Sequence, residues 1–569
     1  MLYSDRAISP FETSSPQCNR LLIFFILGGS VFTLAVLSFL LPVIFAILPS
    51  FSNRFEVLGN FGKSQSDFGR VAMITGFTVT QAFFSAILAV IIGFGAAFFC
   101  ALREFKGRNF LLSLSAIPLS VPPLIIAIAY ILFFGKQGVL NSILNWAFNG
   151  NININFLYSV LGIIIIQAFY NFPIAMQAIT QVWQRLDEEL EEVAALMGAK
   201  PRRIFRQIIL PELWNPILSS FLIIFLYCFF SFMIILMFGG MDFSTLEVEL
   251  YVAGRTTLDI SYAGKIALIE TAIAASLTIG YIFSRKQSTE NVLDLKRQRI
   301  RKKIINKKEN LIFIILMSII ILFLLAPLFS IFIHSFIKTG YTQGGNTFIS
   351  LAPWKKILQT ASTWEAAFNT VWIGITTSIL SIMASLFFLY LNFTTSLKTG
   401  ITENKFSSFI DSVLKFLPYA PLMISSVVLG FGFKIFMPRG SIVILILAQL
   451  ARTWVFAYAQ IQTSFAQIPK DILQAAVLFS SGKRDAFMRV VLPLIKPGIK
   501  TAFAFCFAIS AGDASIPLLL NIPKFKNLSL QIFRLSGSYR FTESSVIAII
   551  LAVITGLVFF ILQRKKETI

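Results

Sequence analysis

Long stretches without a charged residue limit what this chain can fold into more than any other feature. Five of them lack Asp, Glu, Lys and Arg entirely, namely Leu21–Ser50, Val71–Leu102, Asn109–Gly135, Leu213–Met241 and Ala366–Leu397. A helix needs about 20 predominantly apolar residues to cross the hydrocarbon layer of a bilayer, and each of these stretches is longer. Charged residues make up 13% of the chain, against roughly 25% in soluble proteins. The sequence therefore predicts an all-α polytopic membrane protein.

With shorter and interrupted stretches included, the sequence predicts about 12 transmembrane helices, half of them in each half of the chain. The first set is expected at residues 21–48, 73–101, 110–134, 157–181, 217–239 and 264–284. The second set is expected at residues 310–334, 367–391, 410–434, 441–465, 499–520 and 543–563. Prolines lack the backbone N–H that continues a helix. Interruptions of the third, fourth and ninth helices are therefore expected at Pro118, Pro122, Pro123, Pro173, Pro418 and Pro421.

The basic residues predict the orientation of the chain in the membrane. The formal net charge is +21, and positive residues of membrane proteins gather in their cytoplasmic connections. The densest basic run, Arg285–Lys308, lies between the sixth and seventh predicted helices, and Arg564–Lys566 follows the last one. We therefore expect both termini in the cytoplasm, with the basic run close to anionic lipid headgroups of the bilayer. A nucleic-acid tract is the weaker interpretation of such a run, so no nucleic-acid partner is expected.

An internal repeat connects the two halves. The segment Glu192–Pro211 has the order Glu-Val-Ala, three residues, Gly, nine residues, Ile-Ile-Leu-Pro, and Gln474–Pro493 repeats this order with Gln-Ala-Ala, Ser and Val-Val-Leu-Pro. The second copy follows the first at a constant spacing (474 − 192 = 282), which also pairs Gln167 with Gln449. Each copy follows the fourth predicted helix of its half. The repeat is therefore parallel, with an axis along the membrane normal.

The spacing of these two segments resembles the EAA(X3)G(X9)IXLP motif of ABC-importer permeases, and the resemblance covers nearly the whole chain. It implies the type I ABC-importer permease fold in a fused form, with two parallel six-helix repeats. The first half would span residues 1–284 and the second half 310–569, joined by a basic cytoplasmic linker at 285–309. In that family this segment docks on a cytoplasmic ABC ATPase. The resemblance therefore implies two copies of that partner and coupling loops at about 186–211 and 468–493.

The candidate coupling residues follow from this match. In the first loop they are Glu192, Ala194, Gly198, Arg202, Arg203, Leu210 and Pro211. In the second loop they are Gln474, Ala475, Ala476, Ser480, Leu492 and Pro493. Acidic residues before position 193 favour a helix start, Gly198 permits a sharp turn, and Leu210–Pro211 is expected to end the second helix.

Two alternatives bear on these loops. Gln474 and Ser480 depart from the motif, so unequal coupling of the two halves is a hypothesis. An amphipathic helix at the lipid interface would explain one such loop, but it does not explain two copies at matched spacing.

Motifs for chemistry are missing from the sequence. There is no Gly-x-x-x-x-Gly-Lys-[Ser/Thr] phosphate-binding loop, so the chain is not expected to be an enzyme, and ATP is expected on the partner subunit. The single histidine, His334, and four widely separated cysteines offer no metal site. We expect no metal or cofactor bound by this chain.

Ionisable residues inside membrane spans are costly and by default mark function. Three stand out in the predicted spans: Glu270, Arg452 and Asp513. Arg452 and Asp513 are candidates for the translocation pathway, together with Gln167 and Gln449. The alternative is that Arg452 pairs with Asp513 or Glu270 only to hold helices together. Glu270 is expected near the headgroups, with a structural role.

Two blocks predicted outside the membrane concern the substrate. Phe238–Tyr251 contains Gly-Gly followed by Thr-Leu-Glu, and Gly537–Arg540 reads Gly-Ser-Tyr-Arg. Both blocks resemble thiamine transport permeases, which implies a bacterial inner-membrane importer that receives thiamine or its phosphates from an extracytoplasmic solute-binding protein. Ferric-iron permeases are the next resemblance, and a secondary transporter is a third interpretation. A secondary transporter would not require duplicated docking loops.

Overall fold

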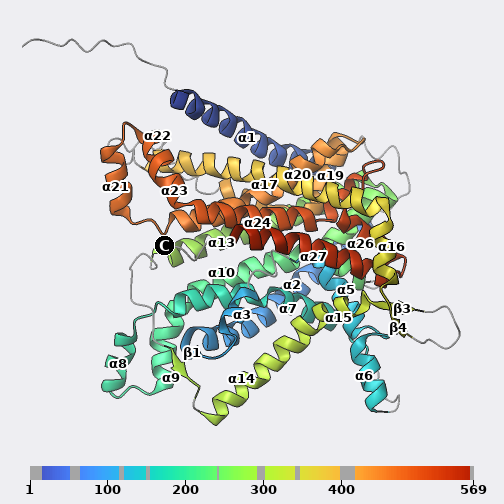
Figure 1. Cartoon of the computed structure of the whole chain (residues 1–569), viewed down its shortest axis with the longest axis horizontal. Helices are drawn as coiled ribbons and strands as arrows, with labels where there is room; N and C mark the ends of the chain where they lie inside the picture. The colour runs from blue at the N-terminus through green and yellow to red at the C-terminus, as the bar shows by residue number, and fades with distance from the viewer. Residues whose placement is uncertain are drawn as a thin grey trace, which may run out of the picture.

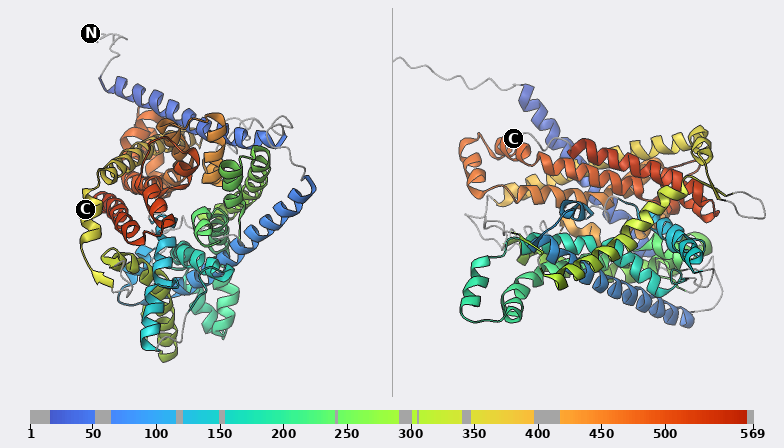
Figure 2. Two further views of the ribbon diagram at one scale, coloured as in Figure 1. Left: turned by 90° about the vertical axis from the view of Figure 1, so that its right-hand side faces the viewer. Right: turned by 60° about the horizontal axis from the view of Figure 1, so that its bottom comes forward.

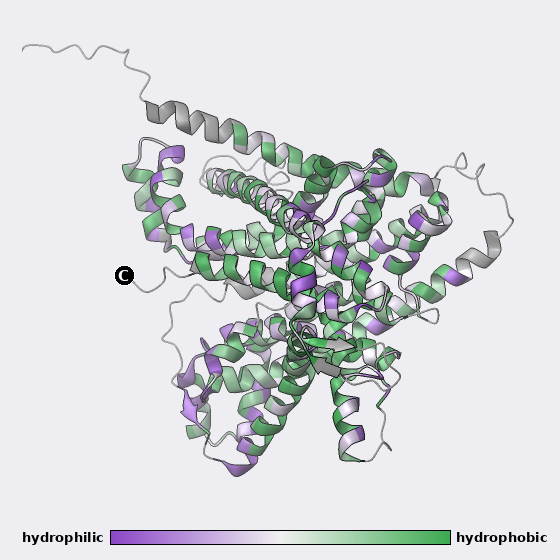
Figure 3. Ribbon diagram, turned by 45° about the vertical axis from the view of Figure 1, so that its right-hand side comes forward, coloured by the Kyte–Doolittle hydropathy of each residue, from purple (hydrophilic) through white to green (hydrophobic). Residues whose placement is uncertain are grey.

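The computed structural model describes residues 16–51, 64–114, 121–148, 154–239, 243–290, 301–304, 306–339, 347–396 and 417–563. Within them, 11 helices are long and apolar enough to cross a membrane, or up to 12 if one bent pair counts as a span. The long helices form one bundle (Figure 1), and hydrophobic residues cover them between more hydrophilic ends (Figure 3). This confirms the all-α polytopic fold.

The first half consists almost entirely of helices. Before the first loop they are α1 (Pro16–Ile47), η1 (Leu48–Phe51), α2 (Ser64–Leu102), α3 (Arg108–Ser113), α5 (Pro123–Phe134), α6 (Val139–Ala147) and α7 (Val160–Trp183). The loop and the helices after it are α8 (Glu188–Leu196), α9 (Pro201–Ile204), η4 (Phe205–Ile209), α10 (Leu210–Phe229), α11 (Phe232–Phe238), α12 (Leu246–Val252), η5 (Ala253–Thr257) and α13 (Ile260–Glu290).

The second half is built in the same way. It begins with α14 (Lys307–Ile320), η6 (Ile321–Leu325), α15 (Ala326–His334), α16 (Ala352–Gln359), α17 (Ala361–Ser396), η7 (Leu417–Met423), α19 (Ser426–Phe436) and α20 (Ile442–Phe465). It continues with α21 (Lys470–Phe479), α22 (Lys483–Ala486), η8 (Phe487–Val491), α23 (Leu492–Leu494), α24 (Lys496–Gly512), α25 (Ser515–Leu520), α26 (Leu528–Gly537) and α27 (Phe541–Gln563).

Four short strands complete the description. β1 (Arg103–Glu104) pairs in parallel with β2 (Lys302–Lys303), and β3 (Ile337–Thr339) pairs in antiparallel with β4 (Thr347–Ile349). Arg103 also forms an ion pair with Glu309. The predicted linker is thus attached to the end of α2 where the structure describes it; residues 291–300 and 305 lie outside the described part.

The two halves repeat the same elements from α7 onward. α20 begins and ends 282 residues after α7 (442 − 160 = 282), and α21, α22, η8 and α26 follow their counterparts at the same spacing. Capping repeats as well: Gly162 N–H donates to Ser159 Oγ (3.2 Å) and Ile444 N–H to Ser441 Oγ (3.3 Å). These hydroxyls satisfy backbone groups that a helix start leaves free. Before α7 the register changes, because the first half contains the additional helix α6.

The N-terminal helices of each half pack on helices of the other half. α1 packs on α17, α19 and α20 of the second half, whereas α15 and η6 pack on α5 and α7 of the first (Figure 2). At the first contact the backbones meet closely, since a Cβ at Gly432 would overlap the Pro42 carbonyl oxygen. At the second, the ring of Phe323 stacks on Phe134 (centroids 5.3 Å apart) and Phe169 (4.8 Å). The halves are therefore interlocked.

Three predicted spans differ from the sequence analysis. The fifth was expected at 217–239, but the structure has a helix from Pro201 to Phe229, followed by the separate helix α11. The third was expected at 110–134, but the structure places its helices at Pro123–Ala147, because Pro122 caps α5 and Pro123 is at its start. The ninth was expected as one helix at 410–434. It is instead η7 and α19, bent by 90°, with Pro418 and Pro421 in η7.

The remaining predicted interruptions give a mixed result. Pro173 lies inside the continuous helix α7, so the prediction that it interrupts the fourth span was wrong. Pro118 and residues 410–416 lie outside the described part of the chain. Proline removes one hydrogen-bond donor and disfavours helix in the preceding residue. The clustered prolines break the helix here, whereas the single Pro173 does not.

We predict that Gly432→Ala destabilises the protein. Alanine favours a helix by about 1 kcal/mol over glycine, but overpacking costs about 1–3 kcal/mol, and here the added methyl group meets the backbone of α1. Thermal unfolding in detergent micelles should therefore occur at a lower temperature. The matched control is Gly76→Ala in α2, where the new Cβ meets no atom within 4 Å. Equal midpoints for the two variants would contradict the close contact between α1 and α19.

Candidate functional site

The two predicted coupling loops lie at the same end of the long helices (Figure 1). In the first loop Asp187 caps α8, since its Oδ1 accepts a hydrogen bond from Glu189 N–H (3.0 Å). Four glutamates follow within α8, where the helix dipole favours negative charge. Gly198 then turns the chain with φ +84°, a conformation that glycine adopts without strain. None of the residues of α8 is buried, so this helix stands free of the bundle.

The predicted end of the second loop helix at Leu210–Pro211 was wrong. The chain is helical from Pro201 to Phe229, because a π-helical turn, η4, precedes the proline. Widening the turn changes which carbonyl each N–H reaches, so the missing donor of Pro211 does not break the helix. The second copy has the same π-helical turn, η8, before Pro493. Each loop thus continues stiffly into a membrane helix, apart from a short break at Ile495 in the second.

The second loop differs from the first in its turn and its charges. Ser480 has φ −95°, so this turn requires no glycine at the motif position. Ala476 is buried in a cluster with Ala486 and Phe487, which anchors α21 more firmly than α8. The charge pattern is partly reversed as well. Arg203 Nε donates to Gln207 Oε1 (2.9 Å) in the first loop, whereas the equivalent positions in the second form the ion pair Asp485–Arg489 (2.6 Å).

The sequence analysis missed a pair of exposed apolar side chains at the tip of each loop. Leu196 and Met197 are 88% and 84% exposed, and their counterparts Leu478 and Phe479 are 80% and 90% exposed. Large apolar side chains this exposed outside the lipid region indicate a contact surface for another protein. Their position in the sequence could have identified them. Leu196–Met197 directly precede Gly198 of the motif, and Leu478–Phe479 directly precede Ser480, 282 residues later.

The other candidate loop residues lie around these tips. Exposed ones are Glu192, Gly198, Arg202, Arg203, Pro211, Gln474 and Pro493. Half-buried ones are Ala194, Leu210, Ala475, Ser480 and Leu492. The motif residues thus form the outer surface of the loops and their junction with the bundle.

A charged pair lies inside the bundle. Arg452 Nη1 of α20 lies 3.0 Å from Asp513 Oδ1 at the end of α24, with the side chains 32% and 3% exposed. Asp513 also accepts hydrogen bonds from Ser515 N–H (3.1 Å) and Ile516 N–H (3.4 Å). Tyr170, which occupies the position of Arg452 in the first half, interacts electrostatically with Arg452. The predicted pairing of Arg452 with Asp513 is therefore present, next to the boundary between the halves.

Two glutamates are also buried in the bundle, and one of them, Glu247, lies close to this pair. Glu270 was expected near the headgroups, but the structure places it well inside α13 with no exposed surface. Glu247 at the start of α12 is 1% exposed and interacts with Glu270, Arg452 and Asp513. The sequence analysis did not identify Glu247 as a charged group of the interior, although it lies in the Thr-Leu-Glu block.

Both candidate glutamines are buried. Gln449 bonds across helices: its Nε2 donates to the Ser510 carbonyl (3.3 Å), and its Oε1 accepts from the hydroxyls of Ser510 and Thr377. Gln167, with no exposed surface, has no hydrogen-bond partner for either amide atom in the described structure. In this conformation Gln449 holds α17, α20 and α24 together, and Gln167 is the unpaired member of the two.

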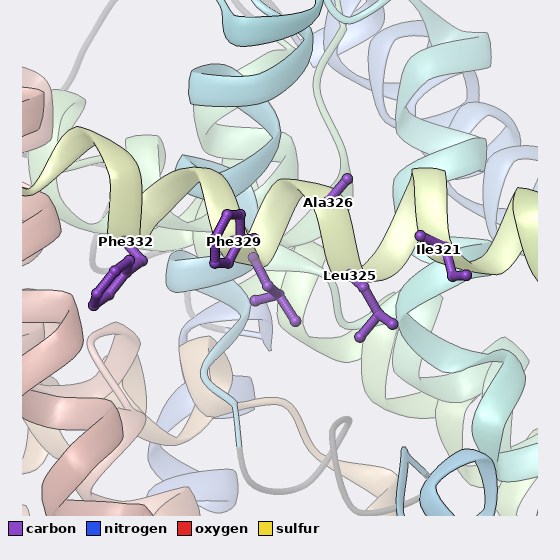
Figure 4. A pocket seen from close by; sticks show the side chains of 6 residues that line it. Ile321, Leu325, Ala326, Phe329 and Phe332 are labelled. Atoms are coloured by element: carbon purple, nitrogen blue, oxygen red, sulfur yellow. The ribbon is translucent and has the colours of Figure 1, made fainter. Parts of the chain in front are cut away.

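One apolar groove lies on the outer side of the bundle. Its lining comes from η6 and α15: Ile321, Leu325, Ala326, Leu328, Phe329 and Phe332 (Figure 4). This lining suits a lipid chain and offers no polar group for a charged solute. Among the described residues, no group of three or more His, Cys, Asp or Glu side chains is placed to hold a metal ion.

Known proteins resemble this chain in sequence. The family model described as "Binding-protein-dependent transport system inner membrane component" matches residues 89–286 and 399–565. The chain is 23% identical over 511 residues to the thiamine transport system permease protein of Escherichia coli, which covers 86% of this chain and 88% of the relative. It is 21% identical over 513 residues to the protein of that description from Haemophilus influenzae, with coverages of 86% and 88%.

A solved structure gives a weaker match. A bacterial ABC transporter involved in the import of the acidic polysaccharide alginate is 15% identical, with a TM-score of 0.34, and covers 46% of this chain and 98% of that chain.

We predict that Arg452→Ala lowers the free energy of unfolding by about 3 kcal/mol, because it leaves a buried carboxylate without its cation. Asp513→Asn should cost less, because a third of Arg452 is exposed and the Asn oxygen still accepts from Ser515 N–H. The double variant should be more stable than Arg452→Ala alone. Thermal unfolding of the three variants in detergent micelles measures this coupling. Strictly additive losses would mean that the pair contributes no coupling energy.

Proposed function

Because the chain belongs to the family of binding-protein-dependent transport system inner membrane components, we propose that its solute is thiamine or thiamine phosphates. The chain is a multi-pass permease of an ABC importer, and the family matches once in each half. The observation that carries the substrate proposal is the extent of the similarity to thiamine permeases, which spans 86% of this chain. That similarity includes both halves and so the pathway between them. The ferric-iron alternative gains no support from these relatives.

The coupling loops are proposed to receive the force of ATP hydrolysis. A permease of this family works with a separate ATPase and a binding protein. We assign two ATPase copies, one for each loop, with ATP bound by those subunits, because α8 and α21 point away from the same end of the bundle (Figure 1). The exposed pairs Leu196–Met197 and Leu478–Phe479 would be buried on docking. The continuous helix from Pro201 to Phe229 would carry the movement into the membrane.

Sidedness follows from the same assignment. With the loops in the cytoplasm, α27 runs back to the cytoplasmic side, and both termini lie there. The opposite end then presents α26 and the β3–β4 hairpin to the solute-binding protein, whereas α12 has no exposed residue. Two ion pairs tie this end together, Lys356–Glu543 (2.9 Å) and Lys526–Glu365 (2.9 Å). ATP-driven closure of the ATPases would turn the halves outward to accept the solute, and reopening would release it inside.

We predict that replacing Leu196 and Met197 together by serine weakens binding of the ATPase at least tenfold. Burial of one large apolar side chain contributes about 1.5–3 kcal/mol to binding. The loss of two such contributions therefore weakens binding by more than tenfold. The equivalent variant of Leu478 and Phe479 should have a similar effect. Titration of the ATPase onto permease in lipid nanodiscs measures the affinity. Ile349→Ser is the control, because Ile349 is 89% exposed in β4, away from the loops. Unchanged affinity in both loop variants would contradict the docking assignment.

The substrate is tested by uptake into vesicles that contain the permease, its ATPase and its binding protein. We expect uptake of labelled thiamine that requires ATP inside the vesicles, and no uptake of labelled ferric iron. Uptake of iron without thiamine would overturn the substrate assignment, and solute uptake without ATP would overturn the importer mechanism.

A further inference from the structure

Two carboxyl groups inside the bundle lack the partners that buried charges normally have. Glu247 is 1% exposed and Glu270 has no exposed surface. In the described structure no hydrogen bond reaches Glu247 Oε2 or either carboxyl oxygen of Glu270. Burying an ionised carboxylate without compensation is among the most costly arrangements in a protein. Intramembrane carboxylates that persist despite this cost line substrate and ion pathways.

The two carboxyl groups belong to one site. α12 packs on α13 and on α19, and Glu247 interacts electrostatically with Glu270. Ser425, the residue that caps α19, lies beside both, but its hydroxyl makes no hydrogen bond to Glu247 Oε2 or to either Glu270 oxygen in this conformation. Its Oγ already accepts a hydrogen bond from Val428 N–H (3.1 Å), which leaves its hydroxyl proton for a carboxylate or a ligand. Because α19 is in the second half, the site lies between the two halves of the protein.

The neighbouring cation does not neutralise this pair. Arg452 is the positively charged neighbour of Glu247, but its guanidinium is 3.0 Å from Asp513 and so is already paired. The group therefore keeps an excess of negative charge when the glutamates are ionised. Arg452 is also 32% exposed, although its helix neighbours Ala451 and Thr453 are at most 1% exposed. About a third of the Arg452 side chain is therefore left uncovered by protein.

Packing does not require an acid at this position. In the second half the residue equivalent to Glu247 is Ser529, at the 282-residue spacing. The Ser529 hydroxyl donates to the Ala511 carbonyl (2.7 Å) and is 1% exposed. A small hydroxyl thus fills the equivalent position in the second half. Packing alone therefore does not explain the carboxylate of Glu247.

We propose that Glu247 and Glu270 bind the positively charged group of the transported solute as it passes between the halves. The ligand class is a solute with one organic cationic group, and this rests on the proposed function in that thiamine and its phosphates carry one positive charge on the thiazolium ring. Such a ring presents a diffuse charge of low hydration, which two carboxylates and one hydroxyl can compensate without a metal-type shell of oxygen ligands. The acidic pair occurs in the first half only, since Ser529 and Ala552 stand at the equivalent positions of the second, so the site takes one cation per pathway.

The test uses Glu247→Gln and Glu270→Gln in the complete importer, with the ATPase and the binding protein, in vesicles. Glutamine keeps the shape and the hydrogen-bonding capacity of glutamate but removes the charge. We expect the initial rate of labelled thiamine uptake to fall at least tenfold in each variant, with equal amounts of assembled complex. Glu249→Gln is the matched control, because Glu249 lies on the same helix but is paired with Arg70 (2.8 Å). Its uptake should stay within twofold of wild type.

A binding measurement keeps the test independent of turnover. Thiamine at millimolar concentration should raise the thermal midpoint of the wild-type complex in detergent and leave that of Glu270→Gln unchanged. If both glutamine variants transport and bind thiamine as the wild type does, the two acids only hold α12 to α13, and the inference is overturned. Absence of thiamine uptake by the wild type would overturn the proposed function and this inference with it.

Discussion

Within a bilayer every backbone N–H and C=O must find its partner inside the protein, because no water is present to replace it. This constraint turns the long apolar stretches into helices and permits irregular backbone only where protein covers it. Irregular backbone in each half obeys it. α5 buries all but two of its 12 residues, and the Val121 carbonyl just before it accepts a hydrogen bond from Tyr170 Oη (2.8 Å). In the second half the Phe323 carbonyl of the π-helical turn η6 accepts a hydrogen bond from Tyr130 Oη of the first half.

The duplication explains why the two halves have the same fold. The side chains that differ between the two copies give each half different interactions. Helices α7 and α20 have the same length and the same serine cap. Their inner faces differ, however, since Arg452 stands where the first half has Tyr170. The partners of the two equivalent glutamines differ too, as Gln449 is fully bonded and Gln167 is not. The same backbone arrangement therefore presents different side chains in the two halves.

Much of this arrangement could be predicted from the sequence, because apolar runs, basic connections and a constant spacing are local signals. The spans, the repeat and the turn at Gly198 belong to this class. Burial cannot be obtained in that way: Glu270 was placed near the headgroups because nothing in the neighbouring residues reports how α13 packs. The same limit applies to Pro211, whose effect depends on the π-helical turn before it, and to α1, which packs on the opposite half. Leu196 and Met197 are apolar and would be predicted as core residues from the sequence, but the structure shows them exposed.

The position of the acidic pair relates binding to movement. Glu247 and Glu270 belong to the first half, whereas Ser425 and the Arg452–Asp513 pair belong to the second. Any displacement of one half relative to the other changes the distances between these groups, and the field at the carboxylates changes with them. A cation held by the pair then has different affinities in the two conformations, and a ligand shifts a conformational equilibrium only through such a difference. By linkage, the conformation that ATP hydrolysis favours also determines how strongly the solute is held. Glu247 and Glu270 therefore lie at the boundary between the halves, where a movement of the halves changes the affinity of the protein for its solute, as transport requires.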